Sequence, residues 1–166
     1  MLSAESASGR HPIEAVTMMD RIIQEVEGDP LYRQLIDASH TSARPGGDVA
    51  EAVCCAMRRA VSLLHAGAIV CYTSSGHTSL RAARERPESP VLSLTPRLPT
   101  ARRLALVWGV HSVHIHDVAS VDEMTELARQ IAGSERFAKA GQFIVAIAGM
   151  PFGTPGTTNL MRIATL

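Results

Sequence analysis

The sequence has few cysteines and few aromatic residues, no long apolar run, and no excess of either charge. Its three cysteines, Cys54, Cys55 and Cys71, show neither a C-x-x-C pair nor the spacing of a secreted disulfide framework, so we expect reduced, mostly buried thiols in a cytoplasmic protein. No stretch of about 18 apolar residues occurs, so we expect no membrane span. Lys plus Arg and Asp plus Glu each number 16, and this balance argues against long-range attraction to nucleic acid or to an anionic membrane.

Familiar catalytic motifs are also missing. The sequence shows no nucleophile–base pair, no paired-carboxylate motif, no Walker loop and no G-x-G-x-x-G, so we expect neither catalytic nor cofactor-binding residues in it. His111, His114 and His116 form an H-x-x-H-x-H pattern, but on a strand His111 would face away from the other two. Only Asp117 lies near enough in sequence to add a ligand, so the pattern favours surface or partly buried histidines over a metal site.

The first third of the sequence reads as helical. Apolar residues repeat at helical spacing over 12–27, with Pro12 in the first turn and Gly28 as a stop. Residues 29–47 carry a short helical piece and then a linker at 39–47, rich in small and polar residues, where we place a domain boundary. The first residues lack the basic region and apolar run of a signal peptide, and we expect the sequence to open in mid-element, as a fragment would.

After the linker, helices and strands alternate. Asp48 with Glu51, and Ser120 with Glu123, resemble capping boxes that begin helices. Strands are expected near 68–72, 90–94, 110–115, 143–147 and 157–166, with helices near 48–64, 78–86, 99–107 and 120–132. Such alternation predicts a three-layer α/β/α sandwich of about five mostly parallel strands. The connection at 149–156 is too short for a parallel crossover, so the last strand should be antiparallel.

One candidate binding segment is the hydroxyl loop, defined as residues 73–78, between a strand and a helix. Free backbone N–H groups at the helix start, the helix dipole and the hydroxyl groups suit a phosphate, and Gly76 allows close approach. Open α/β sheets bind ligands at this end of their strands. The alternative is that the loop only caps the helix. Arg81, Arg84 and Arg86 on that helix form either a solvated face or additional neutralising charge.

A second candidate is the glycine-rich loop, defined as residues 149–159. Its glycines, prolines and hydroxyl groups offer several donors, and it is longer than a hairpin connection requires. A loop of that length without structure of its own is often functional. The alternative is a plain hairpin connection.

Three motifs, in order along the chain, resemble the C-terminal part of pyruvate kinases. Met1–Gly9 followed by His11–Val16 resembles the end of the catalytic barrel of that family, where the last strand reads M-L-S-(G/A)-E-(T/S)-A and its helix opens Y-P-x-E-A-V. Tyr72–Thr78, which includes the hydroxyl loop, followed by Arg84–Pro87 resembles its effector-loop stretch. Ala148–Gly153 with Gly156–Asn159 resembles the A-G-x-P-x-G…G-T-T-N ending of bacterial members.

This resemblance implies domain bounds and a location for the catalytic residues. Residues 1–27 would be a remnant of the catalytic barrel, its last loop and helix, residues 28–47 a linker, and residues 48–166 the C-terminal α/β domain. Members of the family transfer a phosphoryl group between phosphoenolpyruvate and ADP, using Mg²⁺ and usually K⁺ as cofactors. Its catalytic lysine and metal-binding carboxylates belong to barrel strands that would precede Met1. Ser3 and Glu5 match positions near the substrate site but cannot act alone, so we expect this chain to bind and not to catalyse.

The resemblance also implies a ligand and an assembly. The C-terminal domain of the family binds a sugar-phosphate or nucleotide activator and helps to form a tetramer. Two sets of residues would hold the ligand here. The phosphate would be held by Thr73, Ser74, Ser75, Gly76, His77 and Thr78, and the loop that closes over it would include Gly153, Thr154, Gly156 and Thr157.

Departures from the family pattern refine this expectation. Ser74, His77 and Phe152 stand where members that bind fructose 1,6-bisphosphate often carry Lys or Arg. Fewer fixed cations favour a monophosphate such as ribose 5-phosphate or AMP. A purely structural assembly domain and a small independent enzyme are the alternatives. The predicted helix at 12–27 has an apolar face that, by the resemblance, would pack on the barrel. Without the barrel we predict a new contact for this face, for example in a dimer. That face consists of Ile13, Val16, Met19 and Ile23.

Overall fold

The computed structural model describes residues 3–41, 47–154 and 156–166. The chain divides into two compact units, residues 1–44 and residues 45–166. Whether residues 1–27 are a barrel remnant and residues 28–47 a linker stays a prediction.

The first unit contains three helices, α1 (Ala4–Ala7), α2 (Pro12–Gly28) and α3 (Pro30–Thr41). The predicted helix at 12–27 is therefore present, with Pro12 in its first turn. The predicted short helical piece is longer than expected, because α3 continues to Thr41, into the segment assigned to the linker. Its start is fixed by Asp29, whose carboxylate accepts a 2.8 Å hydrogen bond from the Leu31 amide. No residue of α2 is buried.

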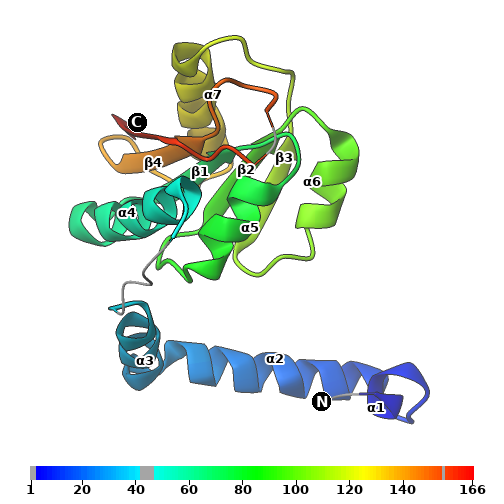
Figure 1. Ribbon diagram of the computed structural model, residues 1–166. Helices are drawn as coiled ribbons and strands as arrows, with labels where there is room; N and C mark the ends of the chain where they lie inside the picture. Colours follow the sequence, from blue (N-terminus) through cyan, green and yellow to red (C-terminus); the bar gives the residue numbers. More distant parts are fainter. Residues whose placement is uncertain (1–2, 42–46, 155) are drawn as a thin grey trace. The chain divides into compact units, whose positions relative to one another are not determined.

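The second unit is built on a five-stranded sheet in the order β3-β2-β1-β4-β5 (Figure 1). Its strands are β1 (Ala68–Tyr72), β2 (Val91–Thr95), β3 (Val110–His114), β4 (Phe143–Ala148) and β5 (Leu160–Thr165). The first four are mutually parallel, and β5 pairs antiparallel with β4. The predicted topology is confirmed.

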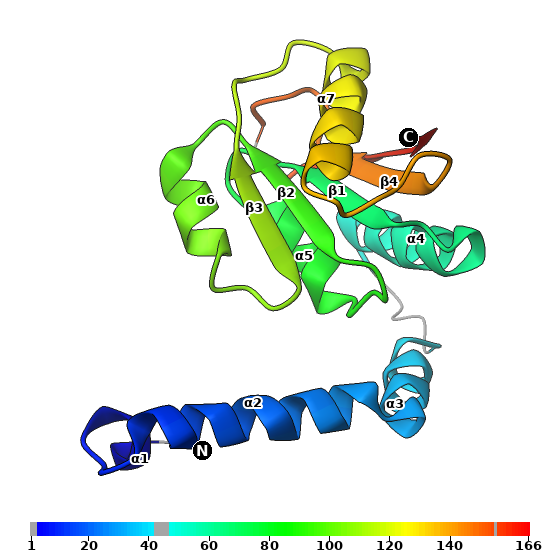
Figure 2. The same ribbon diagram turned by 180° about the vertical axis from the view of Figure 1, so that it is seen from behind.

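Helices cover both faces of this sheet: α4 (Val49–Leu64), α5 (His77–Arg84), α6 (Leu98–Leu104) and α7 (Val121–Ser134). Side chains alternate along a strand, so Val70 of β1 packs on the α7 side while Ile69 and Cys71 face α4 and α5. Seen from behind, α7 lies across the sheet from α4 and α5 (Figure 2). The three-layer α/β/α prediction is confirmed.

Both predicted helix starts have the expected caps. The side chain of Asp48 accepts from the Glu51 amide at the start of α4, and Ser120 accepts from the Glu123 amide at the start of α7. The last strand begins at Leu160, three residues later than predicted, because Asn159 is used by the preceding loop. No helix in the described part of the chain is long and apolar enough to cross a bilayer.

Candidate functional site

The hydroxyl loop leaves the carboxyl end of β1 and turns directly into α5. The turn closes on itself, because Thr73 Oγ1 accepts a 2.9 Å hydrogen bond from the Gly76 amide. Gly76 has φ +89°, a conformation that residues with a Cβ rarely adopt. As the N-cap of α5 it offers no capping side chain, and the His77 amide has only a long 3.4 Å bond to Ser75 Oγ. The first turn of α5 can therefore donate to an anion.

The glycine-rich loop, about 80 residues later in the sequence, also approaches the start of α5. Thr158 is buried, and its Oγ1 lies 2.8 Å from Oγ1 of Thr78 at the start of α5. Gly149 permits this approach, because a Cβ there would lie 2.0 Å from the carbonyl oxygen of Thr157. The base of the loop is held by Asn159, whose side chain exchanges hydrogen bonds of 2.8 and 2.7 Å with the backbone of Met150.

The two loops together line one cavity, here called the two-loop pocket. Most of the predicted binding residues line it: Thr73, Ser74, Ser75 and Thr78 from the first loop, and Gly153, Thr154, Gly156 and Thr157 from the second. Two do not. Gly76 is buried and shapes the turn, and His77 is exposed, with Nε2 accepting a 2.9 Å hydrogen bond from Arg81. The cavity volume is about 20 Å³, room for about one water molecule, so a larger ligand requires the loops to separate.

An aromatic pair forms one wall of the two-loop pocket. The ring of Phe152 meets the ring of Tyr72 edge-on, with centroids 5.0 Å apart. The Tyr72 hydroxyl donates to the carboxylate of Asp117, and burial together with this contact raises the pKa of Tyr72 to about 12. From the sequence, Asp117 is a candidate only as a metal ligand. No local signal in the sequence places it beside Tyr72.

Helix α6 supports the hydroxyl loop from outside. Thr100 Oγ1 donates to the carbonyl oxygen of Ser74 at 3.0 Å, and the Arg103 guanidinium donates to the carbonyl oxygen of Ser75. Sequence reasoning missed both residues. Arg103 brings a cation to the rim of a loop that has no Lys or Arg of its own.

Two of the three arginines that the sequence suggested, Arg81 and Arg86, have other partners. Arg81 forms two hydrogen bonds of 2.5 and 2.6 Å with Asp48, which hold the pKa of that carboxyl at about 2. The guanidinium of Arg86 lies 4.1 Å from the ring centroid of Trp108, a cation–π contact. Neither side chain lines the two-loop pocket.

Other candidate groups do not gather into a site. Among the described residues no cluster of His, Cys, Asp and Glu could hold a metal ion, and His111 and His116 each lie near a glutamate instead. Cys54 and Cys71 are buried and Cys55 is exposed. Burial raises the pKa of the Cys54 thiol to about 12 and that of Cys71 further still, as for thiols that pack and do not react.

Comparison of the sequence with known proteins finds similarity to pyruvate kinases. The model of the pyruvate kinase alpha/beta domain matches residues 51–164. A pyruvate kinase of Methylorubrum extorquens is 44% identical over 164 residues, which cover 99% of this chain and 34% of the relative. A pyruvate kinase of Agrobacterium vitis is 38% identical over 170 residues, and one of Clostridium acetobutylicum 35% over 164, again covering 34% of each relative.

These matches cover nearly all of this chain, which spans about a third of the length of the curated relatives. The family match includes both loops and every strand of the sheet except the last residue of β5. The resemblance seen in the sequence is thereby confirmed. The chain belongs to the pyruvate kinase alpha/beta domain family.

Proposed function

We propose that this chain provides the regulatory domain of a pyruvate kinase and that the two-loop pocket binds a phosphorylated effector. The observation that carries the proposal is the meeting of two loops, about 80 residues apart, in a single cavity at the carboxyl ends of β1 and β4. Ligands bind at this edge in open α/β sheets. The hydroxyl groups and first-turn amides found there are donors, which a phosphate requires.

The positions of the donors suggest that the two loops would contact different parts of the ligand. Thr73, Ser74 and Ser75, with the start of α5, would hold the phosphate. The glycine-rich loop would cover the remainder, with the ring of Phe152 as an apolar contact. None of the described residues that line the pocket is Lys or Arg, and Arg103 on α6 is a cation at the rim. One fixed cation suits a monophosphate such as ribose 5-phosphate or AMP better than a bisphosphate.

Regulation would follow from differential binding. An effector that requires the glycine-rich loop to open and close again binds one conformation better and shifts the population toward it. In the full-length enzyme that shift would act on phosphoryl transfer from phosphoenolpyruvate to ADP in glycolysis. The catalytic residues and the Mg²⁺ and K⁺ sites would belong to a barrel outside this sequence, so the chain alone would bind without turnover. Assembly into a homo-oligomer in the cytoplasm is part of the same proposal.

Thermal unfolding of the chain with individual ligands tests the proposal. Fructose 1,6-bisphosphate, ribose 5-phosphate, AMP and inorganic phosphate are each added at millimolar concentration. A ligand at about 100 times its Kd should stabilise the fold by about 2.7 kcal/mol, since it binds only the folded form. Ser75→Ala with Thr78→Ala should abolish the shift, and the exposed Ser134→Ala should keep it.

The other outcome is equally informative. If none of these ligands raises the melting temperature, the domain serves assembly alone and the regulatory proposal fails. Turnover by the isolated chain would instead support the independent-enzyme alternative.

A further inference from the structure

A second concavity lies near the amino end of β4, whereas the two-loop pocket lies at the carboxyl ends of β1 and β4. This basic groove, of about 700 Å³, runs along α7, the turn that leads to β4, and the end of β5. The residues that matter are Glu126, Arg129, Gly133, Arg136, Lys139 and Leu166. None of them lines the two-loop pocket. Its volume falls in the range of small-molecule sites, roughly 300 to 1,000 Å³.

One stripe of α7 forms a wall of the groove. Glu126, Arg129, Gln130 and Gly133 follow the i, i+3, i+4, i+7 pattern and so share one side of the helix. Glycine inside a helix is unfavourable compared with alanine. A Cβ at Gly133 would lie 3.5 Å from Leu166 Cδ2, an ordinary contact, so the fold does not require glycine there. Its absence of a side chain leaves the groove wider.

Positive charge is in excess in the groove. Three cationic side chains line it, those of Arg129, Arg136 and Lys139, against one acidic side chain, that of Glu126, and the carboxyl group of Leu166, which accepts a 3.0 Å hydrogen bond from the Gly141 amide. The Glu126 carboxylate lies 3.4 Å from Arg129 in an exposed pair. In the described part of the chain, the side chains of Arg136 and Lys139 form no ion pair, so both can receive an anion.

The backbone at Arg136 points to a role for its side chain. Arg136 has φ +61°, just after the end of α7, a place where glycine or asparagine is strongly preferred. A basic side chain also interacts favourably with a helix C-terminus. A test must therefore separate the effect of the arginine on the helix from its effect on a ligand.

We propose that the basic groove binds a small organic polyanion, carrying two or more phosphate or carboxylate charges on an apolar body. Arg136 would bind a charged group through the paired hydrogen bonds of its guanidinium, and Lys139 would add an ammonium point charge. Ala138, Ala140 and Leu166 would contact the body of the ligand. This site is separate from the two-loop pocket, so either proposal can fail alone.

The test is a titration of the ¹⁵N-labelled full chain, followed by amide chemical shifts. The probes are pyrophosphate, citrate and ADP, which separate a bare polyanion, a carboxylate and a phosphate with an organic body. Saturable shifts of the amides over 133–142 are expected, with ADP binding more tightly than pyrophosphate. Arg136→Gly should weaken binding by about tenfold, the equivalent of one charge-assisted hydrogen bond.

Two controls make the outcome decisive. Arg136→Gly should melt no lower than the parent, since glycine suits the left-handed backbone. Arg86→Gly removes the same charge at φ +47°, away from the groove, and should leave binding unchanged. Shifts confined to residues 73–78, unsaturable shifts, or equal binding by Arg136→Gly would overturn the proposal. Equal affinity for ADP and pyrophosphate would overturn its apolar-body part.

Discussion

The side-chain oxygens of Thr78 and Thr158 lie 2.8 Å apart in a buried contact that joins the start of α5 to the glycine-rich loop. Each hydroxyl can donate one hydrogen bond and accept others. The contact therefore fastens the two loops to each other at Thr78, one of the residues that line the pocket.

Replacing Thr158 by valine should destabilise the domain. The shape is kept, but the buried Thr78 hydroxyl loses its partner, which costs about 1–3 kcal/mol. Urea denaturation measures the change, and the slope of the transition should stay the same. Thr165→Val, at an exposed position of β5, serves as the control and should change stability by about 0.5 kcal/mol at most. Equal stability of both variants would show that the contact contributes nothing.

Alanine at Gly149 should be severely destabilising. Its Cβ would lie 2.0 Å from the Thr157 carbonyl oxygen, so backbone must move, and a cost above about 3 kcal/mol is expected. The matched control is Gly133→Ala, where space exists and the helix should gain about 0.5–1 kcal/mol. Chemical denaturation of the two variants compares them directly. A Gly149→Ala protein as stable as the parent would mean that the glycine-rich loop shifts freely.

Acid should weaken the link between α4 and α5. The pKa of Asp48 is lowered to about 2, mainly by its hydrogen bonds from Arg81, so its stabilising effect is present above its ordinary pKa near 4 and is lost as pH falls through about 2. The free energy of unfolding of Asp48→Asn, measured from pH 6 to pH 2, should lie below that of the parent by a constant amount above about pH 4. The difference should shrink below it, and a difference unchanged at pH 2 would contradict the assignment.

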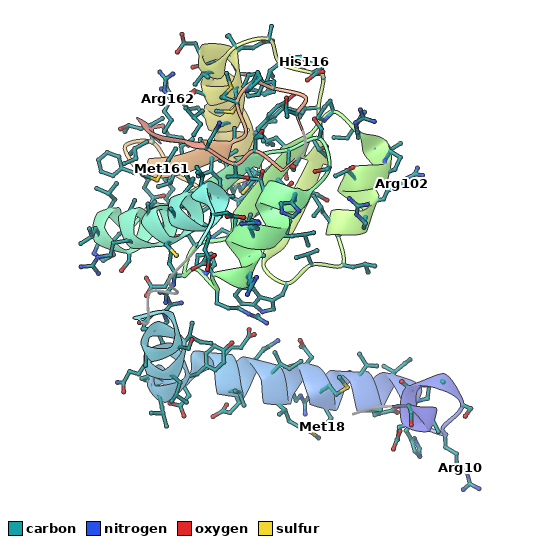
Figure 3. The ribbon with its side chains drawn as sticks, in the orientation of Figure 1. Arg10, Met18, Arg102, His116, Met161 and Arg162 are labelled. Carbon is teal, nitrogen blue, oxygen red and sulfur yellow. The ribbon has the colours of Figure 1, made fainter. Side chains whose placement is uncertain are left out.

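The apolar face of α2 should drive association of the chain. Ile13 is 78% exposed, and Val16, Met19 and Ile23 are between 39% and 53% exposed, so the described residues of the first unit leave this face largely uncovered. Sedimentation should show association that grows with concentration, and Ile23→Glu should reduce it. Met18→Glu is the matched control, because Met18 is similarly exposed but points to a different side of the helix (Figure 3). Strictly monomeric behaviour of the parent would refute the prediction.

Elements with a strong local signal could be predicted from the sequence. The strand at 68–72 matches residue for residue, because its apolar run is bounded by Gly67 and by the hydroxyl loop. The helix starts at Asp48 and Ser120 follow from capping, which depends on residues three positions apart. The antiparallel β5 follows from the length of one connection. On β5, Arg162 pairs with Asp122 of α7 and Met161 lies on the α4 side (Figure 3).

Contacts between distant segments could not be predicted. The sequence suggests Arg81 as a charge that could neutralise a phosphate, but the packing of α5 against α4 brings it to Asp48. Arg103 reaches the hydroxyl loop only because α6 lies beside it, and nothing around residue 103 distinguishes it from Arg102. Tyr72 and Asp117 are 45 residues apart and meet across the carboxyl edge of the sheet. Such pairs depend on the angles between elements, which leave no periodic trace in a sequence.

The two hydrogen bonds between the Asn159 side chain and the Met150 backbone affect how the length of this loop can change among related chains. They close the base of the glycine-rich loop directly above the last residue pair of β4 and β5. Residues inserted or deleted beyond that base would not alter the pairing of the two strands, and each doubling of loop length would cost only about 0.6 kcal/mol. The tip of the loop can therefore change in length while the domain beneath it stays the same.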